Sequence, residues 1–235
     1  MRQSHNIQLF LTPESECNYL PERSSQMLCL DQFYQPDTAM FSALTEQGFR
    51  SSGSFIYRPQ CQHCQACVPV RIDVARFQPT RQQQKTLRRG RQLKASECMP
   101  GFTEERYQLY QKYISVRHID GSMFPPSVEQ FESFLCDDME FARFFEFRLD
   151  ERLLAVAVTD ILYDGLSAVY SFFDPHDKYF SLGRYAILWQ IMQAKELGLD
   201  FLYLGYWIEN HNKMHYKAQY QPIQGLLGAN WQTLG

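Results

Sequence analysis

The pattern of hydrophobic and polar positions divides this chain into two halves. Residues 1–70 hold short apolar segments broken by Pro, Ser and Cys, so few regular elements are predicted there. One is a short helix at residues 37–48, whose apolar side chains share a face and whose last residue, Gly48, is a typical helix end. Another is a strand at residues 49–57, which leads into a loop rich in cysteine.

A second predicted helix begins at a capping-box pattern. Thr80 and Gln83 have the spacing of that motif, and we expect the helix to run toward Lys94. A Pro-Gly pair then interrupts the chain, and we place a domain boundary there. The prediction is an N-terminal domain of residues 1–99 and a C-terminal domain of residues 100–235.

Beyond residue 100, helical and strand patterns alternate. Two helices come first, each opened by a residue that can cap it, Thr103 or Ser127. An antiparallel pair of strands follows, joined by a short charged turn, and a third strand comes after a Tyr-Asp-Gly turn. We expect three helices, one at 103–117, one that begins at Ser127 and one at 182–197. The expected strands span 141–149, 153–162, 166–173 and 201–204.

This order of elements indicates an α+β protein. It is similar to the acyltransferase fold of the acetyl-CoA-dependent N-acetyltransferases (GNAT proteins), which is built around a splayed sheet. The predicted architecture is therefore a small N-terminal domain that contains the cysteines, followed by a GNAT-like acyltransferase domain with a mixed, mostly antiparallel sheet.

Composition limits the class of protein. Of the 235 residues, 45% are hydrophobic and 21% are charged, which is typical of soluble globular proteins. No apolar run reaches the roughly 18 residues of a membrane span, and the first residues lack the apolar core of a signal peptide. We therefore expect a cytoplasmic protein with no membrane partner. The seven cysteines are odd in number and are predicted to be thiols or ligands rather than disulfides.

Positive charge is concentrated in one segment. The net charge is −3, yet residues 71–94 contain eight Lys or Arg and a single acid, Asp73. The alternative to a phosphate contact is a solvated helix face, but the acidic partners typical of such a face are missing. We therefore expect this segment to bind nucleic acid. The residues proposed for that contact are Lys85, Arg88, Arg89, Arg91 and Lys94.

Three cysteines in a C-x-x-C-x-x-C arrangement precede this basic segment. Cys61, Cys64 and Cys67 have a spacing that lets thiolates turn toward one soft metal, and Cys17 can supply a fourth ligand. These residues are therefore candidate ligands of an iron–sulfur cluster or zinc. The alternative is a reduced, tightly packed loop that shapes a pocket, and the sequence leaves both open.

Three sequence blocks, taken in order, resemble one known family. The first runs from Ser54 through the cysteines to Arg81. The second contains Tyr170-Ser171-Phe172-Phe173-Asp174-Pro175, and the third contains Tyr203-Leu204-Gly205-Tyr206-Trp207-Ile208 and the segment 213–222. Together they resemble the arginyl-tRNA–protein transferase family over residues 13–231, and most closely its aspartate/glutamate leucyltransferase branch. The resemblance implies transfer of an amino acid from charged tRNA to the N-terminal residue of a protein, which marks that protein for degradation.

The resemblance also implies partners and chemistry. The expected partners are leucyl-tRNA, proteins that begin with Asp or Glu, and the degradation machinery downstream. No cofactor is required for the chemistry, although eukaryotic members have been linked to an iron–sulfur cluster through cysteines at other spacings. Because an aminoacyl-tRNA ester is already activated, the enzyme has to align amine and ester, accept a proton and stabilise an oxyanion.

Three residues near predicted strand ends are candidates for this chemistry. Asp174 follows a hydrophobic strand and is the first candidate base, with a turn residue as the alternative. Tyr206 can donate to the oxyanion or bind the amine, unless it packs in the core with a satisfied hydroxyl. Glu209 is a third candidate base, with a solvent-exposed glutamate as the alternative.

An acidic acceptor calls for a fixed cation, and arginine binds carboxylates bidentately. We favour Arg76 and Arg71, although both can instead hold tRNA phosphates. Two lysines four residues apart in the third block can grip the acceptor stem or the substrate carboxylate. The full set of candidate substrate-binding cations is Arg58, Arg71, Arg76, Arg81, Lys213 and Lys217.

Other functions stay open. Arginine can be the donor instead of leucine, because a lining by Phe172, Phe173 or Trp207 suits both a leucine pocket and a core. An acetyl-CoA-dependent N-acetyltransferase needs a glycine-rich pyrophosphate cradle, and residues 177–185 have one glycine and a bulky Tyr185. A non-enzymatic zinc module for RNA would not need the acyltransferase half.

Overall fold

The computed structural model of the chain describes residues 7–136, 139–209, 211–212 and 214–234. Its helices are α1 (Thr38–Glu46), α2 (Arg81–Gly90), α3 (Glu104–Arg117), α4 (Val128–Leu135), α5 (Leu182–Glu196) and the 3₁₀ helix η1 (His215–Gln219). Within these residues, no helix is long and apolar enough to cross a membrane.

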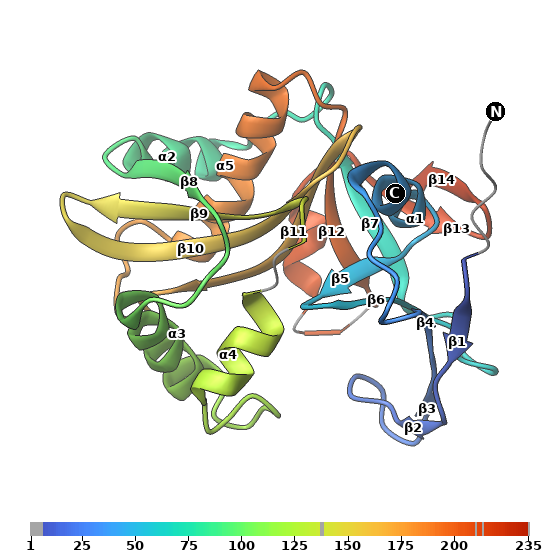
Figure 1. Ribbon diagram of the computed structural model, residues 1–235. Coiled ribbons are helices and arrows are strands. Elements are labelled where there is room, and N and C mark those ends of the chain that lie inside the picture. Colours follow the sequence, from blue (N-terminus) through green and yellow to red (C-terminus); the bar gives the residue numbers. More distant parts are fainter. Residues whose placement is uncertain (1–6, 137–138, 210, 213, 235) are drawn as a thin grey trace.

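The strands form one large sheet and a smaller one beside it (Figure 1). The eight-stranded sheet has the order β14-β13-β7-β12-β11-β10-β9-β8, and the four-stranded sheet has the order β1-β4-β6-β5, while β2 and β3 pair separately. Their bounds are β1 (Leu9–Leu11), β2 (Ser15–Glu16), β3 (Ser24–Ser25), β4 (Met27–Leu30), β5 (Arg50–Ser52), β6 (Phe55–Pro59), β7 (Val68–Asp73), β8 (Lys94–Cys98), β9 (Ala142–Leu149), β10 (Arg152–Ile161), β11 (Gly165–Phe173), β12 (Phe201–Trp207), β13 (Ile223–Leu227) and β14 (Asn230–Thr233).

The predicted α+β fold with a mixed, mostly antiparallel sheet is confirmed. All neighbouring strands of the large sheet run antiparallel except β11 and β12, which are parallel and are connected through α5. The hairpin of β9 and β10 forms as its sequence pattern predicts.

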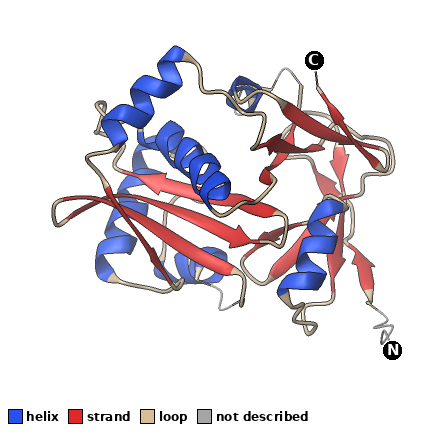
Figure 2. Cartoon of the chain, turned by 90° about the horizontal axis from the view of Figure 1, so that it is seen from above, coloured by secondary structure: helices blue, strands red, loops and turns tan. Residues whose placement is uncertain are grey.

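Helices cover both faces of the large sheet (Figures 1 and 2). Val156 and Val158 of β10 belong to a core cluster with α3 and α4, whereas Ala155 and Ala157 of the same strand pack with α5. Because both faces are buried, β10 reads as a continuous apolar run instead of an alternating one.

The large sheet takes strands from both sides of residue 100. β7 inserts between β12 and β13, and β8 forms the far edge beside β9, although both come from the first 98 residues. The two-domain division at residue 100 stays a prediction, and the sheet itself crosses that point.

Local signals placed most helix ends correctly. Thr80 and Gln83 form the expected capping box at the start of α2, and Thr103 and Ser127 cap α3 and α4. Two predicted elements differ from the structure, one strand and one helix. The predicted strand at 49–57 is a hairpin of β5 and β6 that turns at Gly53, whose φ of 55° suits glycine. The predicted helix at 80–94 ends at Gly90, because the chain turns there and Lys94 begins β8.

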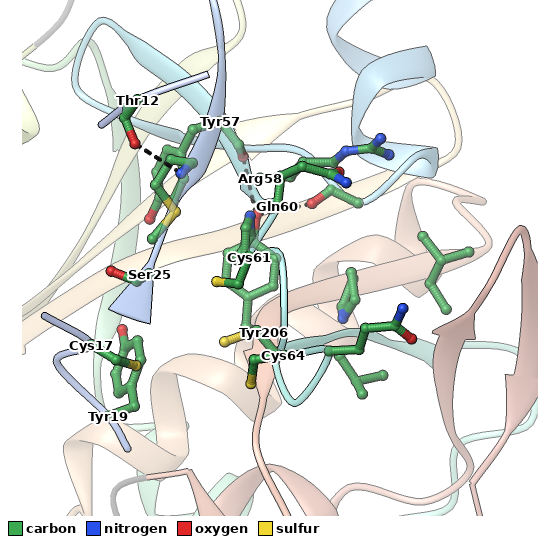
Figure 3. A pocket seen from close by; sticks show the side chains of 18 of the residues that line it. Thr12, Cys17, Tyr19, Ser25, Tyr57, Arg58, Gln60, Cys61, Cys64 and Tyr206 are labelled. Atoms are coloured by element: carbon green, nitrogen blue, oxygen red, sulfur yellow. Dashed lines mark hydrogen bonds between the residues drawn. The ribbon is translucent and has the colours of Figure 1, made fainter. Parts of the chain in front are cut away.

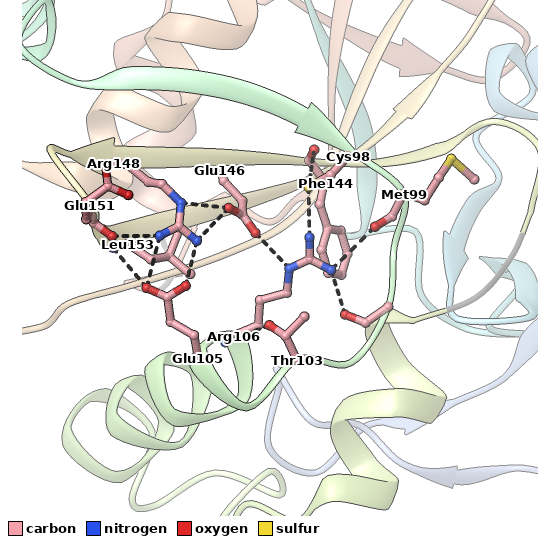
Figure 4. A network of polar contacts seen from close by, with 11 residues as sticks. Cys98, Met99, Thr103, Glu105, Arg106, Phe144, Glu146, Arg148, Glu151 and Leu153 are labelled. Carbon is pink, nitrogen blue, oxygen red and sulfur yellow. Dashed lines mark hydrogen bonds and ion pairs between the residues drawn. The ribbon is translucent and has the colours of Figure 1, made fainter.

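A charged network joins α3 to the edge of the large sheet (Figure 4). Buried Arg106 donates to Glu146 at 2.8 Å and to Cys98 Sγ at 2.9 Å. Arg148 extends the network by pairing with Glu146 at 2.9 Å and Glu105 at 2.6 Å. Since breaking one partner of a buried ion pair leaves an unpaired charge, this network fixes α3 on β9.

Candidate active site

The large sheet opens between its two parallel strands. β11 and β12 pair with each other only at Gly165–Ser167 with Phe201–Tyr203, although each keeps its other neighbour, β10 or β7, further along. The second half of each strand therefore has main-chain groups that need other partners. This opening lies beside the smaller sheet, whose strand β5 contacts β11 through the Arg50 side chain.

A cavity of about 790 Å³ adjoins the opening. Its wall combines the smaller sheet, the cysteine block, the end of β12 and the β13–β14 turn. Figure 3 shows Cys17 and Tyr19 on one side of this cavity, opposite Cys61, Cys64 and Tyr206. The cavity thus gathers residues that lie far apart in the sequence, and its size suits a small-molecule or peptide-end ligand.

Tyr206 is a cavity residue whose hydroxyl is already occupied. The side chain is 5% exposed, and its hydroxyl lies 2.9 Å from the carbonyl of Gly48 and 3.1 Å from that of Tyr57. Burial, together with the nearby Tyr57 hydroxyl, raises the pKa of Tyr206 well above its ordinary value. The hydroxyl therefore stays protonated and acts as a donor to the main chain in this geometry.

Lys217 supports the same part of β12 from behind. It is buried, and its Nζ donates to the main-chain carbonyl of Tyr206. Burial, with Arg50 nearby, lowers the pKa of Lys217 to about 7. Lys217 is absent from the cavity wall, so a direct grip on a substrate stays a prediction. Its predicted companion Lys213 lies outside the described residues.

Among the arginines predicted to bind the acceptor, Arg58 lines the cavity. Its Nη1 donates to the carbonyl of Gln47 at 3.0 Å, and its guanidinium lies 5.1 Å from the centre of the Phe49 ring. Its Nε is buried without a hydrogen-bond partner. Arg58 is therefore fixed in the cavity with donor capacity left.

Arg71, which the sequence favoured, is enclosed in the protein. Its Nε donates to Gln224 at 2.9 Å and its Nη1 donates to the Tyr203 hydroxyl at 3.1 Å. Its guanidinium carbon lies 3.4 Å from the Phe201 ring centre and 4.3 Å from that of Trp231. Because these partners cover it, this arginine braces β7 against β12 and β13 and is not presented to a substrate.

The remaining predicted cations form a separate surface around α2. Lys85, Arg88 and Arg91 are exposed, as are Arg76, Arg81 and Lys94. Arg89 is half-buried, donates to the carbonyl of Tyr179 at 2.9 Å and lies over its ring. None of the five residues proposed for nucleic acid makes an ion pair with another described residue. Arg76 lies 4.0 Å from Asp73 and, like Arg81, belongs to this surface and not to the cavity.

The geometry does not favour Asp174 as a base. The residue is 3% exposed, and its carboxylate pairs with Lys112 at 2.9 Å and with Arg152. Burial acts to raise the pKa of Asp174, but hydrogen bonds from Lys112, the His176 amide and Arg152 outweigh it and lower the pKa. Asp174 does not line the cavity. Glu209 is exposed just after β12 and is likewise absent from the cavity wall.

The cysteines meet around the cavity as free thiols. Cys17, Cys61, Cys64 and Cys67 all line it, and the first three act on the pKa of Cys67. Burial, followed by these thiols, raises the pKa of Cys67 to about 11, so the thiol stays protonated. Across the described residues, no group of three or more His, Cys, Asp or Glu is arranged to hold a metal. The assignment of these cysteines to a metal stays a prediction.

Sequence reasoning missed two features that the fold brings together. Lys112 and Arg152 hold Asp174 from α3 and β10, although no local motif links them. Arg50 reaches from β5 into the opening of the large sheet, where its Nη2 donates to the carbonyl of Val169 at 2.8 Å. No sequence signal separates Arg50 from other arginines, because its role depends on the packing of the two sheets. Phe172, a candidate for a leucine pocket, is fully buried in the core with α3 and α4.

An α+β sheet that opens beside a cavity, with a basic helix elsewhere on the surface, is the arrangement that the sequence analysis expects of an acyltransferase. Family models described as the N terminus and the C terminus of arginine-tRNA-protein transferase match residues 15–85 and 105–227. The chain therefore belongs to the arginine-tRNA-protein transferase family, and it is an aminoacyltransferase.

Full-length relatives agree with this assignment. The chain is 51% identical over 234 residues to the aspartate/glutamate leucyltransferase of Pseudomonas fluorescens (strain Pf0-1), covering 100% of both chains. It is 50% identical, with the same coverage, to the enzyme of that name from Pseudomonas paraeruginosa. Among solved structures, FemX is 8% identical with a TM-score of 0.49, covering 91% of this chain and 84% of that one. A likeness at that level adds nothing to the assignment.

We predict that Asp174→Asn lowers stability by about 1 kcal/mol at pH 7, because the substitution removes the carboxylate charge with which the solvent-exposed Lys112 and Arg152 pair. The folded-state pKa of Asp174 is lowered, so this contribution is complete above the ordinary carboxyl pKa of about 4 and is lost as pH falls through the folded-state value. Urea unfolding of wild type and variant at pH 7 and pH 3 measures the gap, which should shrink at pH 3. A variant with wild-type stability and no activity would instead restore Asp174 as a base.

Proposed function

We propose that this protein transfers leucine from leucyl-tRNA to the α-amine of proteins that begin with Asp or Glu. The added leucine marks those proteins for degradation in the cytoplasm. The observation that carries this proposal is full-length identity of 50–51% to enzymes named aspartate/glutamate leucyltransferase. The expected partners are leucyl-tRNA, acidic N-termini and the degradation machinery.

The surface around α2 supports a tRNA donor. Lys85, Arg88, Arg91 and Lys94 of this surface are exposed and make no ion pair with other described residues, which leaves them available to phosphates. Arg89 lies over the Tyr179 ring at 4.6 Å and so fixes α2 to the segment before α5. A helix of this kind positions an acceptor stem without reading its sequence.

The cavity supports an acidic acceptor. Arg58 lies in its wall, is held by Gln47 and keeps an unpartnered Nε. A carboxylate there would accept charge-assisted hydrogen bonds from a guanidinium that is already ordered. Arg58 thus replaces Arg71 and Arg76 as the residue we propose for acceptor recognition.

Aminolysis of an activated ester needs little acid–base catalysis from the enzyme. The amine nitrogen attacks the ester carbonyl carbon, an amide bond forms, and the ribose hydroxyl leaves with a proton. An α-amine with an ordinary pKa of about 8 is partly unprotonated at neutral pH, so alignment supplies much of the rate. Tyr206 and Lys217 hold the end of β12, where the cavity meets the opening of the sheet. No step requires a cofactor.

Residues 177–185, which include the first turn of α5, argue against acetyl-CoA as the donor. Their one glycine, Gly183, lies so close to Phe173 that an added Cβ would come within 2.8 Å of that ring. Tyr185 is buried and packs against α2 at Gly90. Both residues therefore contribute to packing, and they do not form the glycine-rich cradle that a pyrophosphate needs.

We predict that the purified chain incorporates radiolabelled leucine from leucyl-tRNA into peptides beginning with Asp or Glu, and not into the same peptide beginning with Lys. Arginyl-tRNA serves as the competing donor in a parallel reaction. Transfer of arginine without leucine would assign the protein to the arginine-transferring branch. No transfer from either tRNA would refute the proposed function.

We predict that Arg58→Gln lowers kcat/KM for an Asp-initiated peptide by about 10- to 100-fold, the loss expected for a hydrogen-bonded charge. An Asn-initiated peptide lacks the carboxylate, so its slower reaction should change little and the Asp/Asn ratio should collapse. Arg76→Gln is the matched control, because Arg76 is exposed outside the cavity. A ratio that collapses with Arg76→Gln and survives Arg58→Gln would place acceptor recognition at the α2 surface.

A further inference from the structure

The opening between β11 and β12 contains a positive charge that spans it. Arg50 enters from β5, and its Nη2 donates to the carbonyl of Val169 on β11 at 2.8 Å. The same guanidinium touches β12, because a Cβ added at Gly205 would lie 2.7 Å from Nη1. Arg50 therefore bridges the two strands beyond the point where their pairing ends at Ser167 and Tyr203.

This guanidinium lies directly behind the cavity wall. A hollow of about 10 Å³ lined by Arg50 shares Gly48, Pro69 and Tyr206 with the large cavity. Arg50 also acts on the pKa of Tyr19, another cavity residue. A peptide end bound in the cavity would thus have its amine close to the strand opening that Arg50 occupies.

The Arg50 guanidinium is buried, and Tyr57, Tyr206, Tyr19 and Asp160 all act on its pKa. Asp160 of β10 acts on it more weakly than the nearby tyrosines do, and the Asp160 carboxylate accepts a hydrogen bond from Ser51 at 2.6 Å. The buried amine of Lys217 lies close enough to Arg50 for the charge of Arg50 to lower the pKa of Lys217. Because burial disfavours the charged form of a guanidinium, an anion that arrives with the reaction is favoured at this place.

Two anionic groups take part in the proposed reaction. One is the side-chain carboxylate of the acceptor, and the other is the oxyanion of the tetrahedral intermediate. Arg58 is already available in the cavity for the carboxylate. Arg50 is held in the strand opening by its hydrogen bond to the Val169 carbonyl, next to the cavity that we propose holds the acceptor end. A fixed donor in a water-poor site stabilises charge that develops during the reaction without reorganising.

We infer that Arg50 is a catalytic residue that stabilises the tetrahedral oxyanion formed when the acceptor amine attacks the aminoacyl ester. The inference rests on the proposed function in requiring an aminoacyl-tRNA donor, but not on which amino acid it carries. As the C–N bond forms, the carbonyl π electrons move to oxygen, and Arg50 donates to that oxygen. When the C–O bond to ribose breaks, the negative charge leaves this oxygen and the ribose hydroxyl takes up the proton.

The test compares Arg50→Gln with wild type at saturating tRNA and varied peptide. Loss of one oxyanion donor should lower kcat by about 100-fold, for Asp- and Asn-initiated acceptors alike, with the KM values of peptide and leucyl-tRNA within about threefold. The Asp/Asn ratio therefore survives in Arg50→Gln and collapses in Arg58→Gln. Added methylguanidine should restore part of the rate of Arg50→Ala, an effect that a purely structural role would not produce.

A second pair of variants, one test and one control, examines the position of Arg50 without removing its charge. Gly205→Ala places a Cβ against the Arg50 guanidinium at a backbone φ of 70°, so the rate should fall although the arginine remains. Gly198→Ala carries the same backbone strain at a φ of 71° with no neighbour within 4 Å, and it should keep the wild-type rate. Thermal unfolding of both variants separates the shared loss of stability from the loss of rate.

The activity of the wild-type protein distinguishes a failure of the proposed function from a failure of the inference about Arg50. If wild type transfers neither leucine nor arginine, the proposed function and this inference both fail. If wild type is active and Arg50→Gln keeps a kcat within threefold of it, the inference alone is overturned. A collapse of the Asp/Asn ratio in Arg50→Gln also overturns it, because Arg50 would then bind the acceptor side chain.

Discussion

The pairing of β7 between β12 and β13 is the constraint on which the rest of this structure depends. β7 joins the large sheet by antiparallel registers on both edges, and Arg71 reinforces them by reaching Tyr203 and Gln224. The cysteine block ends where β7 begins, and α2 is the next helix after β7 in the chain. Six extended residues span about 20 Å, so this strand sets the separation between the cavity and α2. A donor with a phosphate backbone and a reactive 3′ end can meet both.

Burial assigns different roles to residues of one type. Arg88 is exposed to solvent, Arg58 lies in the cavity wall, Arg71 is covered by aromatic rings, and Arg50 bridges two strands. The side chain is the same in each case, but the surrounding dielectric and the remaining donors differ. The proposed division of labour between tRNA binding, acceptor recognition and catalysis follows from these surroundings.

Much of the fold was predictable from local patterns. The caps at Thr80, Thr103 and Ser127 and the hairpin of β9 and β10 depend on neighbouring residues, and each formed as expected. The place of β7 in the large sheet was not predictable, because it depends on pairing with strands about 130 residues or more away. For the same reason the sequence ranked Arg71 above Arg58 and gave no sign of Arg50. Proximity in sequence to the cysteine block could not tell a buried guanidinium from an accessible one.

We propose that α2 positions a tRNA whose aminoacyl end reaches the cavity and the strand opening. Cross-linking with a tRNA that carries a photoreactive leucine through a stable amide bond tests this arrangement. Irradiation and mass spectrometry should map the cross-link to cavity or β11–β12 residues, and replacing Lys85, Arg88 and Arg91 with Ala should weaken that cross-link at moderate salt. A cross-link on the α3–α4 face, or one that the α2 substitutions leave unchanged, would contradict the account.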